Sequence, residues 1–143
     1  MTIQETENKV DKQQVELRVA DWKKRVTELY SEINNWLKNT DYTLRLGSKL
    51  TMNEELMLQF GVPKTEVETA DIYNKDKKII LTIKPKGLWI IGANGRIDIL
   101  SVKGNYLLVD FAKQFEEPRW KLFKDTKKDG LEFNHQEFLT LLK

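Results

Sequence analysis

Residues 78–111 form the part of the chain that most constrains its fold. The stretch consists of apolar runs and breaks in the order KIILTIK, PKG, LWII, GANG, RIDIL, SVKGN and YLLVDF. Each run has the length of a strand, and each break contains glycine, proline or asparagine, which favour turns. This pattern is typical of an antiparallel meander. It predicts about four consecutive strands at the centre of the fold.

The alternation of apolar residues within this stretch predicts which side chains share a face. The three expected sets are Ile79, Leu81 and Ile83; Ile97 and Ile99; and Leu107, Val109 and Phe111. Pro85 and Gly87 are expected to end the first strand, because proline offers no ladder donor. Residues 88–91 are apolar on both sides, which favours a central strand. Asn94-Gly95 is expected to form a tight hairpin turn.

A long amphipathic helix is expected before the sheet, over residues 11–38. Apolar residues recur at spacings of four and three: Val15, Val19, Trp22, Val26, Leu29, Ile33 and Trp36. This spacing places them on one stripe of a helix, but it also fits the heptad seam of a coiled coil. The stripe therefore packs on the sheet of its own chain or pairs with another chain. The residues proposed for such an interface are Val15, Val19, Trp22, Val26 and Trp36.

The remaining segments complete an α+β fold. Residues 42–46 and 49–52 predict two strands joined by a hairpin turn at Gly47-Ser48. Residues 66–73 predict a strand with a bulge near Thr69-Ala70. The other expected elements are a short helix at 53–60 capped by Asn53, a strand at 119–124, a pairing segment at 131–133, and a last helix capped by Asn134 with Glu137 three residues on.

We therefore expect a single domain over residues 1–143. It would contain a flexible tail at 1–8, the long helix at 11–38 and a short C-terminal helix at 134–143. The segment 42–133 would form a curled antiparallel sheet of about seven or eight strands.

Residue composition limits the chemistry that this chain performs. It has no cysteine, which excludes disulfides, thiolate metal sites and a cysteine nucleophile. His135 is the single histidine, so the chain has too few histidines for a multi-histidine metal site and little basis for serine–histidine catalysis. We expect no cofactor.

Charge and hydropathy bear on partners and location. The 24 basic and 22 acidic residues give a net charge of +2, which does not indicate a nucleic-acid or membrane partner. No apolar run approaches the ~20 residues of a membrane span. The polar, acidic N-terminus is unlike a signal peptide, so we expect a cytoplasmic protein.

One cluster, Asp98, Asp110 and Lys113 with Arg96, suggests a specific chemistry. An acid on one strand, then an acid and a lysine at the end of its hairpin partner, is similar to the pattern of PD-(D/E)xK nucleases. Such groups hold Mg²⁺ and activate a water, and Glu54 or Glu55 would supply a helix carboxylate. In that family the lysine follows the acid by two residues. Here Lys113 follows Asp110 by three, so a regular strand points it to the opposite face.

The tryptophans allow a second interpretation. Exposed aromatic side chains interleaved with basic residues form stacking platforms for nucleic acid. Trp22, Trp36 and Trp89 lie in apolar surroundings and favour core packing. Trp120 is the exception, because Arg119 and Lys121 flank it.

Several motifs follow one another along the chain in a distinctive order. They are Trp36-Leu37 at the end of the long helix, N-E-E-L at 53–56, P-x-G-x-x-I-I-G-A-x-G-R-I-D at 85–98, and Trp120. In this order the chain resembles a group of small bacterial α+β proteins of unknown function. The resemblance spans most of the sequence. It implies a shared fold unit and no activity, so it assigns no functional residue.

The sequence leaves the function open between two classes. The first is a non-enzymatic binding or scaffold protein that self-associates or binds a partner protein, through the long helix or a sheet edge. The alternative is a metal-dependent nuclease or a nucleic-acid-binding module.

Overall fold

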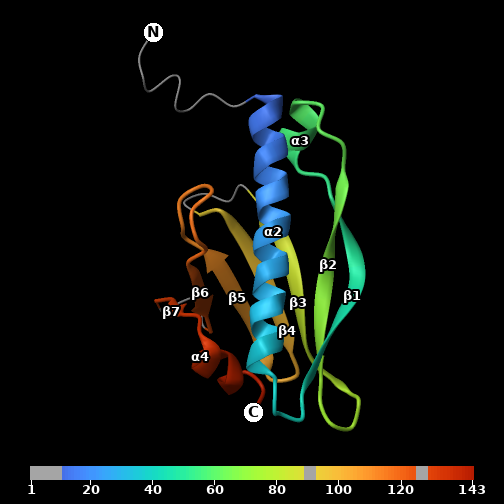
Figure 1. Cartoon of the computed structure of the whole chain (residues 1–143), viewed down its shortest axis with the longest axis vertical. Coiled ribbons are helices and arrows are strands. Elements are labelled where there is room, and N and C mark those ends of the chain that lie inside the picture. The colour runs from blue at the N-terminus through green and yellow to red at the C-terminus, as the bar shows by residue number, and fades with distance from the viewer. Residues whose placement is uncertain (1–10, 89–92, 125–128) are drawn as a thin grey trace.

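The computed structural model describes residues 11–88, 93–124 and 129–143. Within these residues, one long helix crosses a face of a seven-stranded antiparallel sheet (Figure 1). The strands lie in the sheet in chain order, from β1 at one edge to β7 at the other, and the sheet does not close into a barrel. A short helix ends the chain. The predicted α+β architecture is therefore confirmed.

The elements follow one another in this order: α2 Lys12–Trp36, β1 Thr43–Met52, α3 Glu55–Gln59, β2 Thr65–Tyr73, β3 Ile79–Leu88, β4 Gly95–Ser101, β5 Gly104–Asp110, β6 Trp120–Phe123, β7 Leu131–Glu132 and α4 His135–Thr140. Asp11 caps α2, and Asn134 caps α4 by accepting the amide of Glu137 at 2.9 Å. The cap predicted at Asn134 is thus confirmed. The cap predicted at Asn53 is wrong, because α3 begins after Glu54.

Helix α2 uses its apolar stripe to cover the sheet of its own chain. Trp22 and Val26 retain only 1% and 2% of their surface, and both belong to the same core as Ile97 and Leu108. We call this side of the sheet the covered face and the other side the open face. Burial inside one chain removes the stripe from contact with partners. The interface predicted at Val15, Val19, Trp22 and Val26 is therefore corrected to an internal contact, and Trp36 packs at the margin of the same core.

The hairpin turn predicted at Asn94-Gly95 does not form, because neither residue has a positive φ. Instead the buried Asn94 side chain donates to the carbonyls of Ala112 and Lys113. Gly95 begins β4 beneath Trp22, where a Cβ would lie 2.4 Å from the indole Cζ3. Packing, rather than turn geometry, explains this glycine. Residues 89–92, with Trp89 and most of the predicted strand at 88–91, lie outside the described residues.

Two predicted strand ends are bulges within continuous strands. Leu46 pairs with Ala70 and Lys49 pairs with Glu68, so two residues of β1 oppose one residue of β2. The hairpin predicted at Gly47-Ser48 is therefore wrong, and the bulge predicted in β2 lies on β1.

Strand β3 likewise continues through Pro85. Pro85 pairs with Ile97 and Gly87 pairs with Arg96, which leaves Lys86 as the extra residue. A bulge accommodates a proline inside a sheet, so the predicted strand end at Pro85 is wrong.

Strand β5 is apolar on both of its faces. Leu108 is fully buried on the covered face, opposite Ile97. Leu107 and Val109 lie opposite Asp98 and Arg96, whose side chains pair on the open face. Asp110, rather than Phe111, therefore falls on the covered face at the end of the strand.

Candidate functional site

The predicted cluster of Asp98, Asp110, Lys113 and Arg96 is divided between the two faces of the sheet. On the open face, Arg96 Nε donates to Asp98 Oδ1 at 3.0 Å. On the covered face, Asp110 is fully buried opposite Gly95. Lys113 is exposed beyond the end of β5. The structure does not bring the two carboxylates together.

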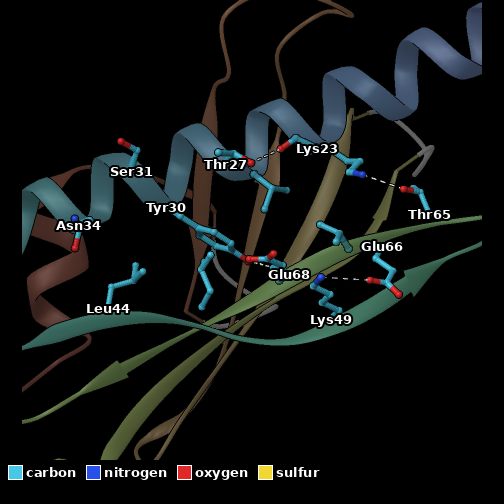
Figure 2. A pocket seen from close by; sticks show the side chains of 13 residues that line it. Lys23, Thr27, Tyr30, Ser31, Asn34, Leu44, Lys49, Thr65, Glu66 and Glu68 are labelled. Carbon is cyan, nitrogen blue, oxygen red and sulfur yellow. Dashed lines mark hydrogen bonds and ion pairs between the residues drawn. The ribbon is translucent and has the colours of Figure 1, made fainter.

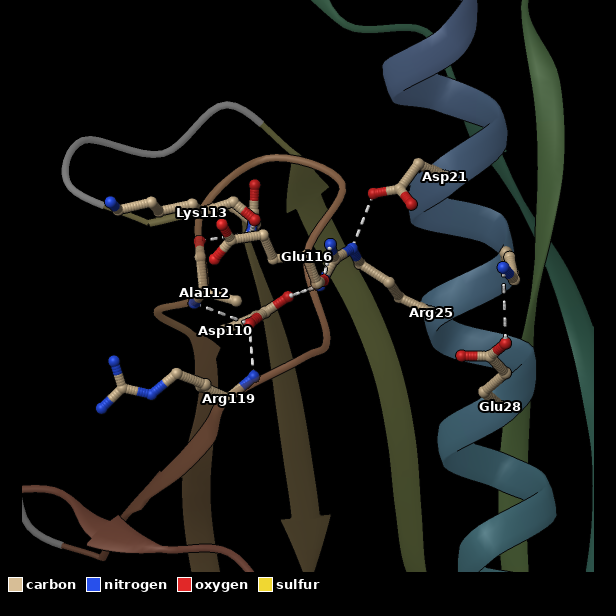
Figure 3. Close-up of polar contacts among 10 residues, drawn as sticks. Asp21, Arg25, Glu28, Asp110, Ala112, Lys113, Glu116 and Arg119 are labelled. Atoms are coloured by element: carbon tan, nitrogen blue, oxygen red, sulfur yellow. Dashed lines mark hydrogen bonds and ion pairs between the residues drawn. The ribbon is translucent and has the colours of Figure 1, made fainter.

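Asp110 joins helix α2 to the connection between β5 and β6 (Figure 3). Its Oδ2 accepts from Arg25 Nη1 at 2.7 Å. Its Oδ1 accepts from the backbone amides of Ala112 at 3.0 Å and Arg119 at 2.8 Å. The carboxylate therefore accepts hydrogen bonds from one cation and two amides, and charge-assisted bonds of this kind are among the stronger ones in proteins.

The other nitrogens of Arg25 are also bonded. Nε donates to Asp21 Oδ2 at 2.6 Å, and Nη2 donates to the carbonyl of Glu116. Since Arg25 is 3% exposed, this network has a structural role as a clamp between elements. Within the described ranges, no group of three or more histidine, aspartate or glutamate side chains is placed to hold a metal ion.

The described tryptophans pack on other rings. Trp22 and Trp120 have ring centroids 6.0 Å apart. Trp36 packs edge-on against Phe133, with ring centroids 5.5 Å apart, and stacks on His135, with ring centroids 5.7 Å apart. Trp120 is half-buried by its contact with Trp22, so this arrangement favours core packing over the stacking platform considered from the sequence.

A groove of about 880 Å³ lies between α2 and the ribbon formed by β1 and β2 (Figure 2). Its walls include the apolar side chains of Val26, Leu44, Leu46 and Val67. Its polar groups are Lys23, Thr27, Tyr30, Ser31, Asn34, Lys49, Thr65, Glu66 and Glu68. Concave sites of this size that combine apolar walls with polar groups are where proteins commonly bind their ligands.

The strand register explains why this groove exists. Strand β2 pairs with β1 along its whole length, but with β3 only from Ala70 to Tyr73. Its first half therefore separates from β3, and α2 binds it instead. Tyr30 Oη donates to the Glu68 carbonyl at 2.6 Å, and Lys23 Nζ donates to Thr65 Oγ1 at 2.9 Å. These two bonds hold the ribbon to the helix across the groove.

The hydroxyl of Tyr30 stays protonated when it makes this bond. Burial raises the pKa of Tyr30 well above its ordinary value of 10, and the carboxylates of Glu68 and Asp71 raise it further. The phenol therefore remains a hydrogen-bond donor throughout the neutral range.

Strand β1 is the edge of the sheet on the groove side. It has a strand neighbour on one side only, so its outer N–H and C=O groups have no ladder partner in the described sheet. Leu46, at the groove, exposes 57% of its surface. Arg45 lies over the ring of Tyr73, and Lys49 Nζ lies 3.8 Å from Glu66 Oε2.

The groove was not predicted from the sequence, because the sequence pattern divides β1 into two short strands. The alternation of Leu44, Arg45 and Leu46 was a usable signal, since it predicts a strand with one apolar face. The signal did not show that the strand continues to Met52 or that no further strand covers its outer side.

Comparisons of the chain with protein-family models, with curated proteins and with solved structures gave no match. The resemblance to a group of small bacterial proteins therefore stays a prediction. Within the part of the chain that the structure describes, no helix is both long and apolar enough to cross a membrane.

Proposed function

We propose that this chain is a non-enzymatic binding protein whose partner protein docks in the groove between α2 and the β1–β2 ribbon. The observation that carries this proposal is the exposed Leu46 on the wall of a groove of about 880 Å³, beside an unpaired strand edge. Covering such a leucine with a partner removes apolar surface from water, which favours association.

The placement of the polar residues supports binding over catalysis. Asp110 and Arg25 are bonded to each other and to neighbouring groups. Asp98 is paired with Arg96 on the other face of the sheet. A nuclease would need these carboxylates to converge on one metal ion.

Because the apolar stripe of α2 is buried, we no longer expect the partner to bind the helix. The heptad-like stripe lies inside the fold, whereas Leu46 and the outer edge of β1 remain accessible. We therefore place the partner contact at the sheet edge.

Capture experiments with three forms of the full chain test the proposal. The tagged wild type, Leu46→Asp and Val102→Asp are each incubated with lysate of the source organism, with and without added nuclease. Val102 is the matched control, because it is 79% exposed and lies in the turn between β4 and β5, away from the groove. Thermal melts followed by circular dichroism check that all three chains fold.

We expect wild type and Val102→Asp to retain the same protein in a fixed ratio, independently of nuclease, and Leu46→Asp to lose it. Retention of that protein by Leu46→Asp would contradict the proposal. Recovery of nuclease-sensitive material alone would instead favour the nucleic-acid-binding alternative.

A further inference from the structure

Resting on the proposed function, we further propose that the partner docks as an extended, acidic segment that adds to the outer edge of β1 as a further strand. Its apolar side chains enter the groove beside Leu44 and Leu46. Three features of the described residues carry this proposal: the backbone of β1, the order of its side chains and its charge.

The backbone of β1 is suited to strand addition. Residues 43–46 pair regularly with β2 before the bulge at Gly47 and Ser48. Their outer backbone groups therefore keep the spacing of an ordinary strand. A peptide in extended conformation pairs with such an edge through main-chain hydrogen bonds, while pockets for alternate side chains supply specificity.

Every second side chain in the first part of β1 lines the groove, which is the spacing that the side chains of an added strand require. Leu44 and Leu46 both line the groove, and Arg45 lies between them over Tyr73 on the opposite face. In a strand paired to residues 43–46, every second side chain lies beside Leu44 or Leu46. Those positions of the partner are expected to be apolar.

The charge of β1 favours an acidic partner over a second copy of this chain. Its charged residues are Arg45 and Lys49, and it has no acidic residue. Two copies whose 43–46 segments paired antiparallel about Arg45 would place the two Arg45 side chains directly opposite each other. Like charges directly opposite each other destabilise a strand pair, whereas acidic side chains at the same places stabilise it.

The inner neighbour β2 carries an acidic residue opposite each cation, so the two cations are the outermost charges of the edge, and nearby lysines add to them. Lys75 and Lys77 line a small cavity together with Arg45 at the start of β1, and Asp41 is the acidic residue in that lining. Glu66 is the present partner of Lys49, but both side chains are about 60% exposed and their charges are 3.8 Å apart. An exposed pair of this kind contributes little, so Lys49 is free to exchange partners.

Two synthetic peptides of equal length test the proposal. Both carry leucine at alternate positions, and the other positions are all glutamate in one peptide and all lysine in the other. Fluorescence anisotropy measures their binding to the full chain, to Arg45→Glu/Lys49→Glu, and to Lys24→Glu/Lys103→Glu. The last variant is the matched control, since it makes the same change of net charge at exposed positions away from β1.

We expect the wild type and the control variant to bind the glutamate peptide at least about tenfold more tightly than the lysine peptide. Arg45→Glu/Lys49→Glu should reverse that preference. Hydrogen exchange should show protection of residues 43–46 when the glutamate peptide binds.

Other outcomes would overturn strand addition by an acidic segment. These are no binding of the glutamate peptide, equal binding of it by the double variant, or protection confined to other strands. If these occur while Leu46→Asp still loses the captured protein, the groove proposal stands and only strand addition fails. A dimer of the chain itself with protected residues 43–46 would assign the edge to a second copy and overturn the acidic partner.

Discussion

The indole of Trp22 lies against Gly95 at the start of β4, so the two residues set how closely α2 approaches the sheet. A Cβ at Gly95 would lie 2.4 Å from Trp22 Cζ3 and 2.9 Å from the Gly87 carbonyl oxygen. Neither distance is tolerated without movement of the helix or the backbone. The sequence marks this glycine only as a turn residue, because a contact between residues 22 and 95 has no local signal.

We expect Gly95→Ala to lower the free energy of unfolding by about 1–3 kcal/mol, since the added methyl group overpacks the contact with Trp22. Gly87→Ala is the matched control on the neighbouring strand. There the nearest atom to the new Cβ is Glu54 Oε1 at 3.4 Å, at the end of a flexible side chain. Urea unfolding followed by circular dichroism measures both variants. Equal losses would contradict the packing explanation of Gly95.

Tyr30 links stability to alkaline pH. Its pKa in the folded protein is raised by burial and by Glu68 and Asp71, whereas the same phenol in the unfolded chain ionises near pH 10. Above pH 10 the unfolded state therefore binds fewer protons than the folded state, and stability falls as pH rises. The contribution of Tyr30 is fully present below pH 10 and is lost above it.

We expect Tyr30→Phe to be less stable than wild type at pH 8 by about 1 kcal/mol, because it loses the bond to the Glu68 carbonyl. Above pH 10 the wild type should lose this advantage by up to about 1.4 kcal/mol per pH unit. Urea titrations of both proteins from pH 8 to 11 measure the difference. A constant difference across this range would contradict the raised pKa.

For the helices and strands, the sequence predicted the type and order of the elements well. It was less successful for the face on which each side chain lies and for the residues at which each element ends. The stripe of α2 and the meander have regular apolar periods, and both are present. Strand β5 could not be oriented, because Leu107, Leu108 and Val109 are all apolar and either face fits the core. Its orientation depends on Asp110, which follows Arg25 by 85 positions and pairs with it only in the folded chain.

The clamp between Arg25 and Asp110 holds α2 against the end of β5. We expect Asp110→Ala to cost about 3–5 kcal/mol in unfolding free energy, since it leaves Arg25 Nη1 and two backbone amides without their acceptor. Arg25 keeps its bonds to Asp21 and to the Glu116 carbonyl. Asp98→Ala is the matched control. It breaks the pair with the half-exposed Arg96 and should cost at most about 1 kcal/mol.

Urea unfolding of both aspartate variants checks this prediction. Similar losses for Asp110→Ala and Asp98→Ala would show that burial does not distinguish the two pairs. Such a result would also mean that the clamp between Arg25 and Asp110 does not stabilise the fold.

At the scale of the whole molecule, one helix crosses an open sheet and leaves strand edges on both sides (Figure 1). The groove lies where β2 separates from β3 and binds α2 through Tyr30 and Lys23. Sequence periodicity predicts that neighbouring strands pair, but it does not state where a pair ends. The fold class could therefore be predicted from the sequence. Predicting the groove would have required the register of three strands and the position of a helix.

In our proposal, a partner protein covers the edge of β1 and the adjoining groove. This is tested by hydrogen exchange of the full chain, measured by mass spectrometry with and without the captured partner. We predict that amide protection increases mainly in β1, Thr43–Met52, and in the part of α2 near Tyr30. Unchanged exchange in β1, with new protection confined to β4 and β5, would place the partner on the open face and overturn the proposed docking at the edge of β1.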